Sequence, residues 1–204
     1  NIQSLEAKPI LCSVIGDDIH GKLFLELMKI SNLSTTGILV SKKRRTTLKT
    51  RVIANEKHQL RVDEEDTQPI QLENQFINNI KNQINHCDVI ILQDYNKGTL
   101  TKKLIREVIS LANKLNIPTI VDPKKINFNT YYNCTVFKPN LSEIKEGMNI
   151  DFNANNQDEI QKATNKLLNK LKAKAILLTM SEKGISITQN KEFVYTPAFK
   201  RKII

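Results

Sequence analysis

Four segments of the sequence place acidic and basic side chains together, each directly after a short apolar run. The segments are 93–98, 122–125, 138–143 and 180–184, and the apolar runs before them are 89–92, 119–121, 136–137 and 175–179. Carboxylates can hold a metal ion and lysines can hold phosphate, so this combination suits phosphoryl transfer. If the runs are parallel strands, the four segments should meet at one edge of a sheet, where ligands bind in such folds.

Each segment also has a simpler structural explanation. Asn140-Leu141-Ser142-Glu143 fits a capping box, with Asn140 as the N-cap residue and Glu143 at the third helical position. Taken alone, this motif favours a cap over a ligand site, although a helix N-terminus can also hold phosphate or hydrated Mg²⁺. Ser181-Glu182-Lys183-Gly184 alone is more typical of a turn between strands than of a nucleotide contact.

The elements that would position these segments alternate between strand and helix. Continuous apolar runs predict buried strands at 10–16, 89–92, 119–121 and 175–179. Apolar residues at helical spacing predict helices after Asp17-Asp18, after Thr101 and over 157–172. This alternation predicts an α/β fold with a mostly parallel, Rossmann-like sheet and helices on both faces.

Residues 46–63 break this rhythm, because their apolar and charged residues alternate with a period of two. Asn55-Glu56-Lys57-His58 lies in the middle as a turn. The pattern predicts a β-hairpin with one apolar and one charged face, within a small lid that projects from the main domain over about 35–66. The charged face would carry Lys49, Arg51, Arg61 and Asp63, which alone would fit a solvated surface as well as an anion site.

Composition excludes several classes of protein. The 204 residues are 40% hydrophobic and 25% charged, which is ordinary for one globular domain, and no apolar run is long enough to span a membrane. The net charge of +10 comes from lysines spread along the chain, with a single basic run at 42–45. Aromatic residues are not interleaved with basic ones, so we expect no nucleic-acid partner. The three cysteines and three histidines show no metal-ligand spacing.

Taken in chain order, five segments resemble the ribokinase, or PfkB-type, family of carbohydrate kinases. They are 46–54, 59–63, 94–98, 121–124 and 139–143, and the resemblance covers almost the whole chain. Within the family, the hairpin segment Thr46-Thr47-Leu48-Lys49-Thr50-Arg51 is similar to the branch that phosphorylates D-glycero-D-manno-heptose 7-phosphate.

The resemblance implies a ribokinase-like domain with a β lid, ATP as phosphoryl donor and Mg²⁺ as cofactor. It places Mg²⁺, through water, at Asn140 and Glu143. Ser181 stands where the family has its first glycine in a Thr-x-Gly-x-x-Gly segment, which puts a close backbone approach there in question. The implied ATP contacts are Lys138, Asn140, Leu141, Ser142, Glu143, Thr179, Ser181, Glu182 and Gly184, and the implied substrate contacts are Lys49, Arg51, Arg61, Asp63, Asp94, Lys97 and Asp122.

Two hallmarks of the family are not found between Asn1 and Ile204. One is an N-terminal strand with a sugar-binding Asp and a following Gly-Gly, and the other is a Gly-Ala-Gly-Asp motif whose Asp is the general base. We therefore expect residues 1–204 to be a single incomplete kinase domain, with no catalytic base within it and the base beyond Ile204.

The expected activity is ATP- and Mg²⁺-dependent phosphorylation of the anomeric hydroxyl of a heptose 7-phosphate, for ADP-heptose and lipopolysaccharide synthesis in the cytoplasm. The alternatives are a kinase for another sugar or phosphosugar and a non-catalytic member that binds sugar or nucleotide. A nucleic-acid-binding protein ranks behind all of these. The exposed edge of the hairpin invites pairing, so a homodimer through the lid is a further expectation.

Overall fold

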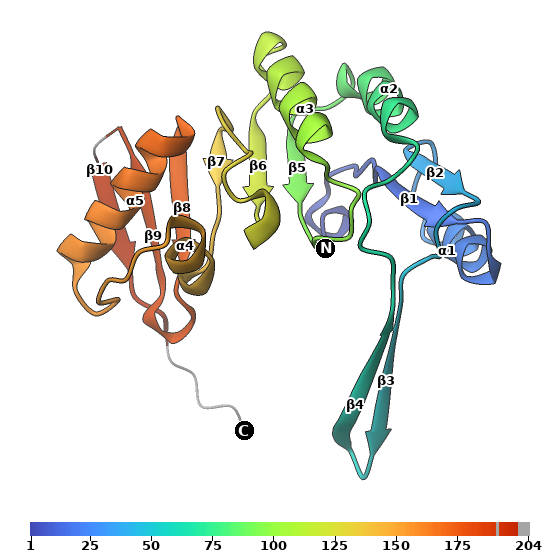
Figure 1. Ribbon diagram of the computed structural model, residues 1–204, viewed down its shortest axis with the longest axis horizontal. Coiled ribbons are helices and arrows are strands. Elements are labelled where there is room, and N and C mark those ends of the chain that lie inside the picture. Colours follow the sequence, from blue (N-terminus) through green and yellow to red (C-terminus); the bar gives the residue numbers. More distant parts are fainter. Residues whose placement is uncertain (191, 200–204) are drawn as a thin grey trace. The chain divides into compact units, whose positions relative to one another are not determined.

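The computed structural model describes residues 1–190 and 192–199, which form two compact units (Figure 1). Unit 1 consists of residues 1–85 and 97–101, and unit 2 consists of the rest of the chain from residue 86 onward. The chain therefore enters unit 2 at residue 86, returns to unit 1 for five residues and then continues in unit 2. The polar segment that follows the apolar run 89–92 is divided between the two units.

Unit 1 begins with a short 3-10 helix, Gln3–Leu5, followed by β1, α1 and β2. Strands β1 (Ser13–Gly16) and β2 (Ile38–Ser41) pair in parallel, and helix α1 (Ile19–Ile30) connects them. Asp18 caps α1, because its carboxylate accepts the backbone N–H of Gly21 at 2.8 Å. The second oxygen of Asp18 accepts the N–H of Thr46 at 2.8 Å, which fixes the chain just before the hairpin.

The hairpin predicted from the period of two is present as β3 (Leu48–Ala54) and β4 (Lys57–Glu64). Among the described residues these antiparallel strands pair only with each other, and helix α2 (Glu73–Ile84) follows them. Lys49 faces Asp63, Arg51 faces Arg61 and Val52 faces Leu60. Alternate residues point to opposite faces of a strand, so the charged side chains share one face and the apolar ones share the other.

Unit 2 contains the larger sheet, in the order β10-β9-β8-β7-β6-β5. The four strands from β5 to β8 are parallel, and β9 and β10 extend the sheet in antiparallel fashion. The mostly parallel sheet predicted from the sequence is thereby confirmed. Its strands are β5 (Ile90–Gln93), β6 (Thr119–Asp122), β7 (Val136–Phe137), β8 (Ala175–Thr179), β9 (Ile185–Gln189) and β10 (Glu192–Thr196).

Helices α3 (Lys102–Lys114), α4 (Leu141–Met148) and α5 (Gln157–Leu171) complete unit 2, with α3 and α5 over the sheet in Figure 1. Short 3-10 helices lie at Lys125–Asn127 and Ser181–Lys183. The core contains Leu92, Val121, Phe137, Ile176 and Leu178, one from each parallel strand and a second from β8. Val121 and Phe137 pair across the sheet, as do Phe137 and Ile176. This buried surface holds the carboxyl ends of the strands in place.

Two details of unit 1 differ from the sequence-based expectation. The first strand begins at Ser13 instead of residue 10, because residues 10–12 contribute only an isolated bridge from Ile10 to Ser34. In α1 the apolar positions Leu23, Leu27 and Ile30 are half-exposed or more, whereas Gly21 and Met28 are buried.

None of the helices within the described residues combines the length and apolarity required to cross a membrane.

Candidate functional site

The carboxyl ends of β5, β6 and β7 lie beside one another in unit 2, as the sequence predicted. The N–H of Asp94, directly after β5, donates to the carbonyl of Asp122 at 3.0 Å. Lys138, directly after β7, pairs with the Asp122 carboxylate at 3.1 Å. Asp122 and Lys138 are both partly exposed, so this edge of the sheet offers an accessible acid and base close together.

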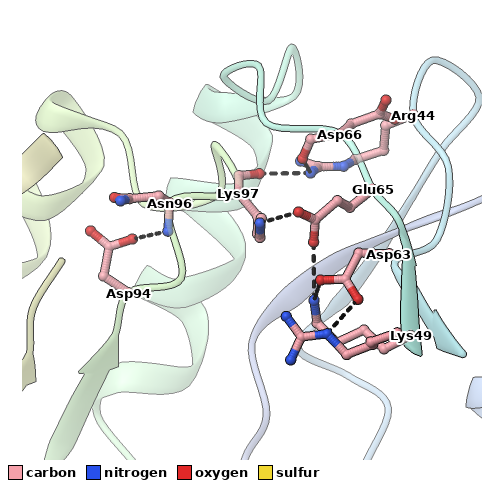
Figure 2. Close-up of polar contacts among 9 residues, drawn as sticks. Arg44, Lys49, Asp63, Glu65, Asp66, Asp94, Asn96 and Lys97 are labelled. Carbon is pink, nitrogen blue, oxygen red and sulfur yellow. Dashed lines mark hydrogen bonds and ion pairs between the residues drawn. The ribbon is translucent and has the colours of Figure 1, made fainter. Parts of the chain in front are cut away.

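Asp94 itself is turned into the protein, and only 3% of it is exposed. Its Oδ2 accepts the hydroxyl of Tyr131 at 2.7 Å and the side-chain amide of Asn127 at 3.0 Å. Its Oδ1 accepts the N–H of Asn96 at 2.8 Å (Figure 2). The surrounding protein uses both carboxylate oxygens, so we interpret Asp94 as a residue that fixes the strand end and not as a direct substrate contact.

Helix α4 begins with the capping box expected from its sequence. The Asn140 side chain accepts the N–H of Glu143 at 2.8 Å, and the Glu143 carboxylate accepts the N–H of Asn140 at 2.9 Å. The second oxygen of Glu143 accepts the ammonium of Lys124, which follows β6. This hydrogen bond, the largest cause, raises the pKa of Lys124. Lys124 was absent from the sequence-based site and joins it here.

The segment after β8 lies against the segment before α4. The N–H of Thr179 donates to the carbonyl of Pro139 at 3.0 Å, and Thr179 forms a bridge with Asn140. Two of the predicted ATP-binding segments therefore adjoin each other within unit 2. Ser142 is exposed and bonds Glu146 at 3.0 Å, while Leu141 is partly buried.

The Ser181–Gly184 turn contains two residues with a positive φ. Ser181 adopts a positive φ of 53°, a conformation that glycine enters most easily. Gly184 has a φ of 92°, and a Cβ there would lie 2.1 Å from the carbonyl oxygen of Thr196. Gly184 is therefore required by space and conformation, whereas Ser181 keeps the turn at some cost in strain. Glu182 is exposed on the same turn.

The residues present at α4 fit a hydrated Mg²⁺ better than a metal held by protein alone. The described residues contain no cluster of three or more His, Cys, Asp or Glu side chains that could hold a metal. Glu143 supplies a carboxylate and Asn140 a carboxamide, and one oxygen of each side chain already accepts a hydrogen bond of the capping box. Mg²⁺ commonly keeps several waters and binds through one or two carboxylates together with phosphates, which matches this limited donor set.

In unit 1, the charged face of the hairpin forms a network with the chain on either side (Figure 2). Lys49 pairs with Asp63 at 2.9 Å and with Glu65 at 3.2 Å, and Glu65 also accepts the ammonium of Lys97. The hydrogen bond that Lys49 donates to the Asp63 carboxylate is the largest cause that raises the pKa of Lys49. Arg61 pairs with Asp63 at 2.8 Å. Three of the predicted cations are thus neutralised within unit 1.

Arg51 differs from these three cations. It is exposed on β3, directly opposite Arg61, and no ion pair involves it within the described part of the chain. Like charges facing each other across a hairpin are unfavourable. A bound dianion would relieve this repulsion, so the position of Arg51 suits a phosphate group.

Two arginines of the basic run 42–45 serve the fold of unit 1. Arg44 donates to the backbone carbonyls of Asp66 and Lys97 at 3.0 and 2.7 Å. The N–H of Arg45 donates to the Asp66 carboxylate at 2.7 Å. Arg44 thereby links the end of the hairpin to the Lys97 segment (Figure 2).

Comparison with known proteins identifies the family of this chain. All 204 residues match the model of the pfkB family carbohydrate kinases. The chain belongs to this family. Solved structures of the same fold include Escherichia coli phosphofructokinase-2 in complex with fructose-6-phosphate, with a TM-score of 0.74 and 18% identity over 98% of this chain and 66% of that one. Arabidopsis thaliana ribokinase complexed with ribose and ATP gives a TM-score of 0.72 at 15% identity over 99% of this chain and 65% of that one.

Curated relatives in the pfkB family are more similar in sequence. The bifunctional protein HldE of Helicobacter pylori strain J99 is 35% identical over 207 residues, which cover all of this chain and 44% of that protein. The bifunctional protein HldE of Wolinella succinogenes is 33% identical over 189 residues, which cover 92% of this chain and 40% of that protein. The chain thus spans less than half the length of these relatives.

Proposed function

We propose that this pfkB-family chain belongs to an ATP- and Mg²⁺-dependent kinase that phosphorylates the anomeric hydroxyl of a heptose 7-phosphate. The similarity to HldE over the whole chain supports the choice of branch. The observation that carries the proposal concerns Arg51, which lies opposite Arg61 on the charged face of the hairpin and forms no ion pair within the described ranges 1–190 and 192–199. A neutral sugar gives such a pair no counter-charge, whereas a sugar phosphate does.

The proposed roles divide the predicted residues into two groups. Arg51 binds the 7-phosphate, and the network of Lys49, Asp63, Glu65 and Lys97 holds the hairpin in the conformation that presents it. In unit 2, the strand ends and the turn at 181–184 bind ATP, and Lys138 neutralises phosphate charge. Asn140 and Glu143 hold hydrated Mg²⁺, which when bound neutralises the negative charge of the transferred phosphoryl group.

The proposed reaction is an in-line displacement at the γ-phosphorus. The anomeric oxygen forms the new P–O bond, the bond from phosphorus to the β–γ bridging oxygen breaks, and ADP leaves. The proton of the sugar hydroxyl passes to a general base, and we assign that role to no residue among those described. The product is a heptose 1,7-bisphosphate, which would supply ADP-heptose and lipopolysaccharide synthesis.

The direct test is phosphoryl transfer by the full-length protein. ATP-Mg²⁺ is supplied with heptose 7-phosphate, ribose, fructose 6-phosphate or adenosine in separate assays, and ADP release and phosphorylated product are measured. Turnover with heptose 7-phosphate alone is expected. Turnover with a different acceptor would refute the proposed substrate but support the proposed kinase activity. The absence of turnover with all four acceptors would favour a non-catalytic binding protein.

A pair of matched variants tests the role of Arg51. Arg51→Ala is expected to raise the KM for the phosphosugar roughly tenfold or more, because a charge-assisted contact to phosphate is lost. Lys57→Ala, at the exposed start of β4 in the same hairpin, serves as the control. An unchanged KM in Arg51→Ala would show that the phosphate binds elsewhere.

A homodimer through the hairpin is a second part of the proposal. The apolar face of the hairpin leaves Val52, Leu60 and Val62 half-exposed. An isolated two-stranded hairpin is marginally stable in water, so a second copy that covers this face would add burial where it is lacking.

A further inference from the structure

The ion pair between Lys124 and Glu143 joins the end of β6 to the start of α4. Glu143 Oε1 accepts the Lys124 ammonium, and Oε2 accepts the backbone N–H of Asn140. The Glu143 side chain is 11% exposed, whereas that of Lys124 is 41% exposed. A largely enclosed carboxylate therefore already holds a cation, and that cation can still reach solvent.

The adjacent ion pair provides a contrast. Lys125 pairs with Glu146 on the same helix at 3.3 Å, but these side chains are 71% and 51% exposed. Exposed pairs contribute little, because water competes for both charges. The carboxylate of Glu143 is screened less, so its attraction for whichever cation occupies it is stronger. Only the Lys124 pair involves a residue to which we assign metal binding.

We propose that Lys124 is an exchangeable cation at the nucleotide site: it occupies Glu143 before nucleotide arrives and moves to the nucleotide phosphates when the metal takes its place. This inference rests on the proposed function, in which Glu143 and Asn140 hold hydrated Mg²⁺. A metal ion and an ammonium group at one carboxylate repel each other, because both are positive. A metal that enters at Glu143 therefore displaces Lys124 from Oε1, and a nearby negative group stabilises the displaced ammonium.

The charges around Lys124 indicate what that partner is. The nearby acids are Asp122 and Asp94. Asp122 already pairs with Lys138, and Asp94 is buried in its own hydrogen bonds. A nucleotide phosphate supplies the missing anion and brings the metal with it. Metal alone should therefore bind weakly, and metal with nucleotide should bind well.

The experiment measures metal binding and not turnover. Mn²⁺ is titrated into the full-length protein, with and without a non-hydrolysable ATP analogue, and bound metal is followed by electron paramagnetic resonance. Lys124→Met should bind Mn²⁺ alone about fivefold more tightly, because the competing cation is gone. It should bind the Mn²⁺–nucleotide complex at least about fivefold more weakly, because a phosphate contact is lost. Lys125→Met should match the wild type in both titrations.

The opposite signs of the two effects separate this proposal from its rivals. If Lys124→Met matched the wild type in both titrations, or weakened both, Lys124 would be no exchangeable cation. If the wild type itself failed to bind the Mn²⁺–nucleotide complex, that result would refute the proposed function, and the proposed exchange of Lys124 would be refuted too. Lys124→Arg keeps the charge and should retain the wild-type pattern, and circular dichroism of each variant verifies its fold.

Discussion

The buried cluster of Asp94, Asn127 and Tyr131 provides a quantitative test of how unit 2 is held together. Asp94→Ala removes the acceptor for the Tyr131 hydroxyl, and Tyr131 is fully buried. An orphaned buried hydroxyl costs about 1–3 kcal/mol, and the lost contact to Asn127 adds about 0.5–1.5 kcal/mol. We therefore expect Asp94→Ala to lower the free energy of unfolding by about 1.5–4.5 kcal/mol, a large share of the roughly 5–15 kcal/mol typical of folded proteins.

A double-mutant cycle isolates the Asp94–Tyr131 contact. Tyr131→Phe should cost about 1–2 kcal/mol, because the carboxylate loses one of its donors while Asn127 and the N–H of Asn96 remain. In the double variant no hydroxyl is orphaned, so the combined cost should fall short of the sum by about 1–2 kcal/mol. Urea unfolding of the full-length protein, followed by far-ultraviolet circular dichroism, measures all four corners of the cycle.

Asp151→Ala is the control for the loss of an acidic residue, because the Asp151 side chain is 89% exposed. It should leave the free energy of unfolding close to that of the wild type, because water screens an exposed charge. A coupling energy near zero between Asp94 and Tyr131, or a cost for Asp94→Ala no larger than that for Asp151→Ala, would refute the structural role assigned to this cluster.

Three further predictions concern stability and assembly. Gly98→Ala should destabilise unit 1 by about 2 kcal/mol or more in thermal unfolding, because Gly98 has a φ of 73° and a Cβ would lie 1.9 Å from the carbonyl oxygen of Gln68. Burial, the largest cause, raises the pKa of Cys134 to about 12 and that of Tyr131 above its usual range. Because the folded state favours the protonated forms, stability should hold at neutral pH and fall as pH rises above about 9, with a shallower fall for Tyr131→Phe above about pH 10. Leu60→Glu should convert a hairpin-mediated dimer to a monomer in sedimentation velocity, since it puts a charge into the apolar face.

Each of these has a contrary outcome. A Gly98→Ala protein with wild-type unfolding temperature would mean that the turn relaxes without cost. A stability that stayed constant up to pH 11 would contradict the buried, neutral state of Tyr131 and Cys134. A dimer that survived Leu60→Glu, or a wild type that is monomeric at high concentration, would remove the hairpin as the interface. Glu56→Gln, on the exposed turn, is the control for the dimer test.

The sequence predicted the elements with strong local patterns. The apolar runs after residue 88 became parallel strands, and the period of two over 46–63 became the hairpin. The capping box at Asn140 could be predicted because its two partners, Asn140 and Glu143, lie three residues apart in the sequence. Strands β9 and β10 were not among the predicted elements. In β9 the polar residues Ser186 and Thr188 are buried and Ile185 and Ile187 are exposed, so the apolar residues do not mark the buried face.

The partners of the charged side chains could not be predicted from local patterns. Tyr131 lies 37 residues from Asp94 in sequence, so no local sequence pattern around Asp94 indicates that its carboxylate is buried. Glu65 lies just after the predicted hairpin, and its pairing with Lys49 and Lys97 depends on where the chain turns after β4. Which cation lacks an ion pair among the described residues is therefore a property of the tertiary structure.

The hairpin of β3 and β4 has a consequence for how this family can change. Among the described residues its strands pair only with each other, so substitutions on its charged face alter no register in the parallel sheets. Selectivity for the acceptor could then drift by mutation at a few surface positions, at little thermodynamic risk to the scaffold. Under the proposed function, a hairpin transplanted over 48–64 into another family member should bring a preference for a phosphorylated acceptor and leave the recipient's melting temperature nearly unchanged.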